Sequence, residues 1–161
     1  MRKKKRPDSS PETPEQTARR LALGLLARRE HSFHELAVKL AQRGLDDDVI
    51  ETALDALQAE NLLSEERFVE QFVRSRIERG DGPMKIRAEL AQRGIDLHRA
   101  EQEIEAQDPD WVQLADAQRR KRFGAEIPVE FAERARQARF LQGRGFGMGE
   151  IQRALKGDIE E

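Results

Sequence analysis

The feature that most constrains the fold is a short motif, Leu-x-x-Arg-Gly, that occurs three times along the chain. It occupies residues 40–44, 90–94 and 141–145, and an apolar residue follows each copy. The motif is a typical helix stop, because glycine adopts the left-handed conformation without steric cost and arginine favours the negative end of the helix dipole. The glycines are spaced by 50 and then 51 residues. Such regular stops predict an internal repeat of about three helices per copy.

The apolar positions between the stops repeat with the same spacing. An offset of 50 residues pairs Ser32 with Gly82, Leu36 with Ile86, Leu40 with Leu90, Ile50 with Ala100, and Leu54 with Ile104. An offset of 51 adds Ile151 and Leu155 to the last two pairs. Helix formers dominate and strand patterning is absent. We therefore predict an all-α fold, an elongated, curved array of three tandem three-helix repeats with about nine helices.

The composition favours an array over a single globule. Charged and apolar residues each make up 37% of the chain, which implies a small core and a large solvated surface. The predicted organisation is a disordered, basic and proline-rich tail at 1–16, then repeat 1 at 17–63, repeat 2 at 64–109 and repeat 3 at 110–161.

Start and stop signals also predict individual helices. The first helix is predicted over 17–29, and a longer helix is predicted over 128–142 from the helical spacing of its apolar residues. Helical spacing places Phe131, Met84 and Leu97 on buried faces. Trp111 is predicted to anchor the core of repeat 3, with stacking on a nucleobase as the alternative.

No group of residues typical of an enzyme occurs in the sequence. The chain has no cysteine, no Gly-x-Ser-x-Gly turn, no phosphate-binding glycine loop and no His-Glu-x-x-His motif. Three histidines alone do not make an ordinary structural zinc site, and we expect them at the surface or beside helix caps. We therefore expect no catalytic residue, metal, cofactor or small-molecule substrate. No apolar run suits a membrane span or signal peptide, so we expect no membrane association and a cytoplasmic protein.

The net charge of −2 conceals a strong asymmetry along the chain. Residues 30–66 carry ten acidic and two basic side chains, whereas residues 110–156 carry six acidic and ten basic ones. Helix-turn-helix recognition of DNA is disfavoured, because the helices that would enter the major groove are acidic. The candidate contact residues for a partner or for DNA are therefore the basic side chains on the first two helices of repeats 2 and 3: Arg67, Arg74, Lys85, Arg87, Arg119, Arg120, Lys121, Arg122, Arg136 and Arg139.

Helix phase separates two of the arginines in repeat 2. Arg74 falls on the face opposite Val69 and Phe72, so we expect it to be exposed and available for contact. Arg76 falls between those two apolar residues, so we expect its stem to lie along the core and its guanidinium to pair with a carboxylate.

Three segments carry a resemblance to a known family. They are residues 25–36, with Leu-Leu-Ala-Arg-Arg and Ser-x-x-Glu-Leu; residues 68–86, with Phe-x-x-x-Phe-Val-Arg-Ser-Arg and Gly-Asp-Gly-Pro-x-Lys-Ile; and residues 140–146, with Phe-Leu-x-x-Arg-Gly-Phe. In this order and spacing, they make the chain resemble the RecX family of recombinase regulators over nearly its whole length. The family has no compact site motif, so the candidate residues above rest on charge and helix phase.

The resemblance implies a bacterial, cytoplasmic protein built of tandem three-helix repeats. Members of the family bind the RecA recombinase assembled on single-stranded DNA, lodge in the groove of that filament, and inhibit ATP hydrolysis and strand exchange. The implied role is therefore regulation of recombination, DNA repair and the SOS response, with the RecA filament and its single-stranded DNA as partners. The alternative is a sequence-independent DNA-binding helical protein that acts without a recombinase.

Overall fold

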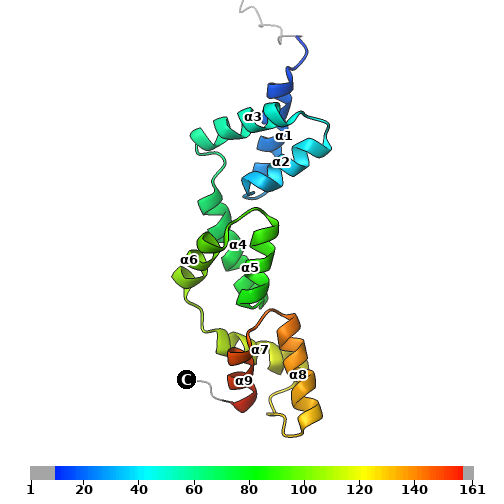
Figure 1. The fold of residues 1–161 in the computed structure, drawn as a ribbon, viewed down its shortest axis with the longest axis vertical. Helices are drawn as coiled ribbons and strands as arrows, with labels where there is room; N and C mark the ends of the chain where they lie inside the picture. The colour runs from blue at the N-terminus through cyan, green and yellow to red at the C-terminus, as the bar shows by residue number, and fades with distance from the viewer. Residues whose placement is uncertain (1–9, 158–161) are drawn as a thin grey trace, which may run out of the picture. The chain divides into compact units, whose positions relative to one another are not determined.

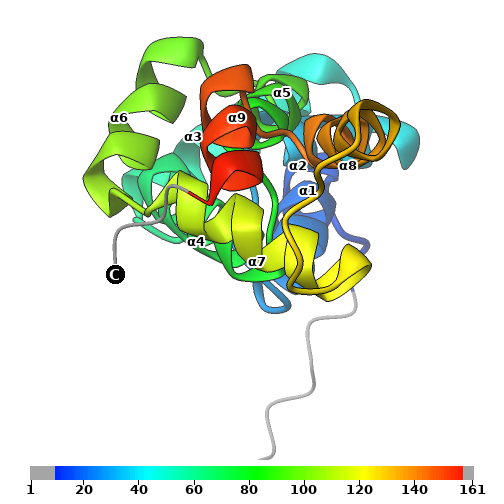
Figure 2. The same cartoon turned by 90° about the horizontal axis from the view of Figure 1, so that it is seen from below.

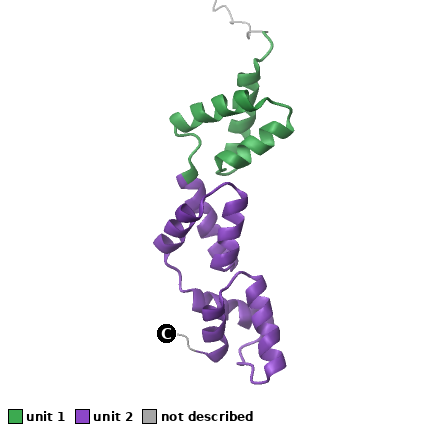
Figure 3. Cartoon of the chain, in the orientation of Figure 1, with its two compact units in different colours: residues 1–65 green, residues 66–161 purple. Residues whose placement is uncertain are grey.

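The computed structural model describes residues 10–157, and in that part of the chain every regular element is an α-helix (Figure 1). The helices are α1 (Pro14–Leu26), α2 (Phe33–Gln42), α3 (Asp47–Ala59), α4 (Glu65–Arg79), α5 (Pro83–Gln92), α6 (Leu97–Gln107), α7 (Trp111–Phe123), α8 (Phe131–Gly143) and α9 (Met148–Lys156). The chain divides into two compact units, Met1–Glu65 and Glu66–Glu161 (Figure 3). The all-α prediction with three-helix repeats is confirmed.

Each group of three helices encloses its own apolar core. The leucine of each stop motif lies in one of these cores, with Leu40 1% exposed and Leu90 and Leu141 fully buried. Trp111 packs against the cores of both repeats in the second unit, as expected of a core anchor. In repeat 3, α9 packs against both α7 and α8 (Figure 2).

The three predicted stops end α2, α5 and α8 by the same geometry. Gly44, Gly94 and Gly145 have φ angles of +84°, +78° and +97°, which lie in the left-handed region. After each glycine, the backbone amide of the apolar residue donates to the carbonyl oxygen of the motif leucine, at 3.4, 3.0 and 3.2 Å in chain order. The same carbonyl oxygen also accepts from the backbone amide of the motif arginine, at 3.0, 3.0 and 3.1 Å. The two bonds together satisfy a carbonyl at the end of each helix. The stop motif is therefore part of the scaffold.

Within the second unit, repeats 2 and 3 meet through their backbones. The amide of Gly82 donates to the carbonyl oxygen of Arg144 at 2.8 Å, and the amide of Met84 donates to that of Gly145 at 2.9 Å. A Cβ atom built on Gly82 would lie 2.3 Å from the carbonyl carbon of Gly145, and one built on Gly145 would lie 2.3 Å from the Cβ of Lys85. The two glycines therefore permit an approach that side chains would prevent.

The structure corrects the start of the first helix. Helix α1 begins at Pro14 rather than at residue 17, because Thr13 and Gln16 form a reciprocal capping box. The predicted disordered tail therefore overlaps the helix, and its residues 1–9 lie outside the described part. Of the two positions expected for the histidines, His31 takes the one beside a helix cap, because it directly precedes Ser32, the N-cap of α2, and it is 2% exposed. Its Nδ1 lies 3.0 Å from the carbonyl oxygen of Arg29.

Three side chains predicted to be inward are exposed. Met84 is 57% exposed, Leu97 is 64% exposed and Phe131 is 87% exposed. Each lies in the first turn of its helix, where the chain has not yet entered the packed face. Helix α8 begins at Phe131 rather than at Pro128, so the residues before it form a loop.

Candidate nucleic-acid and partner interface

The basic run at the end of α7 does not lie on one face. Arg119 is fully buried and donates from Nη2 to Asp116 Oδ1 at 2.9 Å. Its Nη1 donates to the carbonyl oxygens of Glu126 at 2.9 Å and of Gly124 at 3.4 Å. Arg119 thus anchors the loop between α7 and α8, and it is not available for contact with a partner. The structure removes it from the candidate set.

The other three basic residues of the run are exposed. Arg120 donates from Nε to Asp116 Oδ2 at 2.6 Å, which places two arginines on one carboxylate. Within residues 10–157, Lys121 has no hydrogen-bond or ion-pair partner. The Cζ of Arg122 lies 5.7 Å from the ring centroid of Phe140. The last turn of α7 therefore presents positive charge with little internal neutralisation.

Helix α8 adds two more exposed cations beside an aromatic pair. Phe123 and Phe140 pack edge to face, with ring centroids 5.3 Å apart. The Cζ of Arg136 lies 5.2 Å from the Phe123 centroid, and its Nη1 donates to Glu133 at 3.4 Å. Arg139 has no partner in the part of the chain that the structure describes. We define the repeat 3 basic face as Arg120, Lys121, Arg122, Arg136 and Arg139.

The carboxylate of Glu133 offsets part of the positive charge of this face. Glu133 accepts a hydrogen bond at 3.1 Å from Nε2 of Gln137, which is 3% exposed. That hydrogen bond, together with the charge of Arg136, lowers the pKa of Glu133 from its ordinary value. Glu133 is therefore ionised at neutral pH and compensates part of the positive charge beside Arg136.

The four candidates in repeat 2 are more fully neutralised. Arg74 is exposed, as its helix phase indicates, and donates to Glu70 at 2.7 Å. Lys85 pairs with Asp81 at 3.4 Å, and Arg87 pairs with Glu101. Arg67 is half-buried and interacts within the protein. These four residues therefore do not form a continuous free surface comparable to the repeat 3 basic face.

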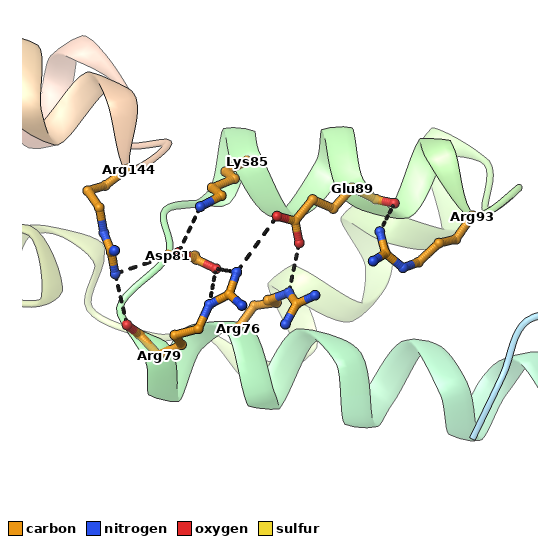
Figure 4. A network of polar contacts seen from close by, with 7 residues as sticks. All are labelled: Arg76, Arg79, Asp81, Lys85, Glu89, Arg93 and Arg144. Atoms are coloured by element: carbon orange, nitrogen blue, oxygen red, sulfur yellow. Dashed lines mark hydrogen bonds and ion pairs between the residues drawn. The ribbon is translucent and has the colours of Figure 1, made fainter. Parts of the chain in front are cut away.

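A cluster of ionic contacts sits where α4, α5 and the end of α8 meet (Figure 4). We define the Asp81 cluster as Arg79, Asp81, Lys85 and Arg144. The Asp81 side chain is fully buried, with Arg79 at 2.7 Å, Lys85 at 3.4 Å and Arg144 at 3.6 Å. Nη2 of Arg144 also donates to the carbonyl oxygen of Arg79 at 2.9 Å. The cluster joins repeats 2 and 3.

Arg76 lies beside this cluster and behaves as its helix phase predicts. Its Nε donates to Glu89 Oε2 at 2.7 Å (Figure 4). Its Cζ lies 4.4 Å from the ring centroid of Phe72. The side chains of Arg76 and Glu89 are only about one-fifth exposed. The predicted role of Arg76 as a packed, paired arginine is confirmed.

Two exposed apolar residues were missed as contact candidates. Val129 is 90% exposed and Phe131 is 87% exposed, at the end of the loop before α8. A groove of about 420 Å³ beside them is lined by Val129, Phe123, Ile127 and Pro128, with Glu126, Glu130, Glu133 and Gln137. Sequence periodicity assigned Phe131 to the core because it assumed that α8 began earlier.

Helix α3, in the first unit, presents the opposite charge. Helix α3 begins with Asp46 at its N-cap and has Asp47 and Asp48 in its first turn. The Asp46 side chain accepts no capping hydrogen bond. Glu51 and Asp55 continue the exposed acidic surface along the helix.

Within residues 10–157, no group of three or more histidine, aspartate or glutamate side chains is arranged to hold a metal ion. None of the helices in the same residues has the length and apolar character that crossing a lipid bilayer requires.

Comparison with known proteins identifies the same three repeats. Profiles of the RecX family match here as its first three-helix domain at 18–57, its second at 64–102 and its third at 108–155. A regulatory protein RecX of Halorhodospira halophila is 48% identical over 146 residues, which cover 91% of each chain. Another, from Pseudomonas fluorescens, is 50% identical over 142 residues, covering 86% of this chain and 90% of the relative.

A solved structure agrees with the fold. The crystal structure of RecX from Lactobacillus salivarius superposes with a TM-score of 0.76 at 19% sequence identity. The match covers 89% of this chain and 96% of that chain. At this identity the likeness concerns the arrangement of the helices alone.

Proposed function

Because the chain belongs to the RecX family of regulatory proteins, we propose that it binds the RecA recombinase assembled on single-stranded DNA and inhibits it. The protein lodges in the groove of the filament and slows ATP hydrolysis and strand exchange without performing chemistry of its own. It thereby regulates recombination, DNA repair and the SOS response in the cytoplasm, where the recombinase acts.

The observation that carries this proposal is the separation of opposite charges onto particular helices, with acids on α3 and the repeat 3 basic face on α7 and α8. The repeat 3 basic face attracts phosphates, and two of its members, Lys121 and Arg139, have no partner among the described residues. Helix α3 offers aspartates that repel phosphates and attract basic protein surface. A filament made of DNA and protein supplies both kinds of partner. We propose that the basic face contacts DNA and that α3 contacts recombinase subunits.

The exposed Val129 and Phe131 complete the proposed protein contact. Neither side chain can pair with a phosphate, and each leaves a large apolar surface in water. The glutamates of the neighbouring groove repel nucleic acid from this side of the loop. We propose that this loop packs against a recombinase subunit while the basic face is directed to the DNA.

The test is the rate of ATP hydrolysis by RecA on single-stranded DNA as the protein is added. We expect the rate to fall when the protein is still below one copy per recombinase subunit. The double variant Lys121→Gln, Arg139→Gln is expected to inhibit less. The matched control removes the same charge from α9, as Arg153→Gln with Lys156→Gln, and is expected to inhibit like the unmodified protein. Unchanged turnover at equimolar protein would contradict the proposal.

The second candidate is a sequence-independent DNA-binding protein that acts without a recombinase. The partner-free cations of repeat 3 favour it, since they would attract any single strand. The two candidate functions are distinguished by measuring the affinity of the protein for bare single-stranded DNA and its affinity for assembled filament. Equal affinities at the same salt concentration would favour the second candidate, whereas tighter binding to the filament would favour the first.

A further inference from the structure

A groove of about 520 Å³ opens between α1 and α2 in the first unit (Figure 1 shows the two helices). Its apolar lining comes from Leu21, Leu25 and Leu40, with the backbone of Gly24 between the first two. Its charged lining is entirely basic and consists of Arg20, Arg28, Lys39 and Arg43. The groove therefore combines an aliphatic floor with a positive rim.

Three of the four cations on the rim have no carboxylate partner within residues 10–157. Only Arg20 has one, since its Nε donates to Glu12 at 2.7 Å. Nζ of Lys39 lies 3.1 Å from Nε2 of His31, which accepts the hydrogen bond but brings no negative charge. Arg28 and Arg43 have no hydrogen-bond or ion-pair partner among the described residues. Three positive charges beside an apolar surface are thus left for an external anion.

Gly24 keeps the floor of this groove open. It lies inside α1, where glycine weakens a helix relative to alanine. A Cβ atom built on Gly24 meets nothing within 4 Å, so the fold itself does not require glycine at this position. The absence of a side chain leaves the helix backbone accessible to whatever enters the groove. This differs from Gly82 and Gly145, whose missing side chains are needed for packing.

We propose that the groove binds an acidic peptide segment of a partner protein. An aliphatic side chain of that segment packs over Gly24 against Leu21 and Leu25, and its carboxylates pair with Arg28, Lys39 and Arg43. Charge complementarity selects acids, and the aliphatic floor selects a peptide over a nucleic acid. The lining contains no aromatic side chain on which a base could stack. This site lies in repeat 1 and does not depend on the basic face of repeat 3.

The binding test uses the full chain and a short fluorescein-labelled peptide of glutamates and leucines, followed by fluorescence anisotropy. We expect saturable binding that weakens when the leucines are replaced by serines and when the glutamates are replaced by glutamines. A labelled oligothymidine serves as the nucleic-acid comparison. Absence of saturable peptide binding overturns the proposal. It is also overturned if the oligothymidine binds in the groove and displaces the peptide.

Two variants locate the binding. Gly24→Leu fills the groove with a helix-forming side chain and is expected to weaken peptide binding about tenfold or more while leaving thermal stability unchanged or higher. The matched control is Gly149→Leu in α9, because a Cβ there also meets nothing within 4 Å, and it is expected to leave binding unchanged. If Gly24→Leu binds the peptide normally, the groove is not the site.

The charge variant Arg28→Gln with Arg43→Gln is also expected to weaken binding about tenfold, since it removes two charge-assisted contacts. If the charge variant loses binding but Gly24→Leu does not, the peptide is held by surface charge alone and the proposal fails. None of these measurements contains recombinase, so their outcome is separate from that of the ATP hydrolysis test.

Discussion

The backbone amide of Gly82 lies 2.8 Å from the carbonyl oxygen of Arg144, 62 residues later in the chain, and this bond joins the loop before α5 to the end of α8. The same arginine reaches back with its guanidinium to Asp81 and to the carbonyl oxygen of Arg79. Repeats 2 and 3 are therefore connected by backbone and side-chain contacts from one short stretch. This explains why they form one compact unit.

Replacing Gly82 by alanine is expected to destabilise the second unit by about 1–3 kcal/mol, because the new methyl group would overlap the backbone at Gly145. Urea unfolding followed by circular dichroism measures the change. The control is Gly143→Ala at the end of α8, where a Cβ meets nothing within 4 Å and stability is expected to be unchanged or slightly higher. If the Gly82→Ala and Gly143→Ala proteins are equally stable, the close approach of Gly82 to the backbone of Gly145 does not require glycine.

The arginines of the three stop motifs show how far sequence can predict side-chain roles. Helix-dipole capping was expected of all three, and Arg93 fits, since its Nη1 donates to the carbonyl oxygen of Glu89 at 2.9 Å. Arg144 instead binds the end of another helix, α4. Arg43 has no partner among the described residues and lines a groove. The motif determines the backbone, whereas the partner of each arginine depends on which helix packs beside it.

For Arg119, helix phase predicts a buried side chain, whereas the surrounding run of basic residues predicts an exposed one. Arg119 lies four residues after the fully buried Ala115, so helix phase alone would have directed it inward. Its place in a run of four basic residues led to a surface assignment instead. Arg119 binds the carbonyl groups of Gly124 and Glu126, which lie in the loop after α7. Because these partners lie outside a helix, helical periodicity does not predict them.

Arg119→Met is expected to reduce the free energy of unfolding by about 3 kcal/mol. The substitution leaves Asp116 with one partner fewer and leaves two loop carbonyls without a donor. Urea unfolding measures the loss. Lys121→Gln is the comparison, because this exposed residue has no described partner and its replacement is expected to change stability by less than about 0.5 kcal/mol. An Arg119→Met protein as stable as the unmodified one would show that these buried contacts contribute nothing to folding.

The repeat 3 basic face makes a quantitative prediction about salt. If Lys121 and Arg139 each neutralise one phosphate of single-stranded DNA, their replacement by glutamine makes the slope of log affinity against log salt shallower by about 1.4. Filament binding is measured over a series of salt concentrations. Arg153→Gln with Lys156→Gln again serves as the control of equal charge. A slope equal to that of the unmodified protein would mean that the two residues contact no phosphate.

Phe131 is predicted to act in binding and not in folding. Because the side chain is 87% exposed, Phe131→Ser is expected to leave stability within about 0.5 kcal/mol of the unmodified protein. If the loop packs against recombinase, the same variant weakens filament binding about tenfold or more while the salt slope stays unchanged. A loss of stability without a loss of affinity would show that the residue belongs to the fold.

His31 makes the stability of the first unit sensitive to pH. Burial lowers the pKa of His31 below its ordinary value of 6.5. Its Nε2 accepts a hydrogen bond from the Lys39 ammonium at 3.1 Å, which requires the neutral ring. The unfolded chain therefore binds a proton more readily than the folded chain. The stabilising contribution is complete above about pH 6.5 and is lost as the pH falls towards and through the lower pKa of the folded state.

The measurement is urea unfolding of the full chain at a series of pH values from neutral to mildly acidic. The control is His31→Gln, whose amide can donate to the carbonyl oxygen of Arg29 and accept from Lys39 but does not titrate in this range. We expect the unmodified protein to lose stability relative to this variant as the pH falls below about 6.5. If the free energy of unfolding of the two proteins changes with pH in parallel, protonation of the buried His31 ring does not destabilise the fold.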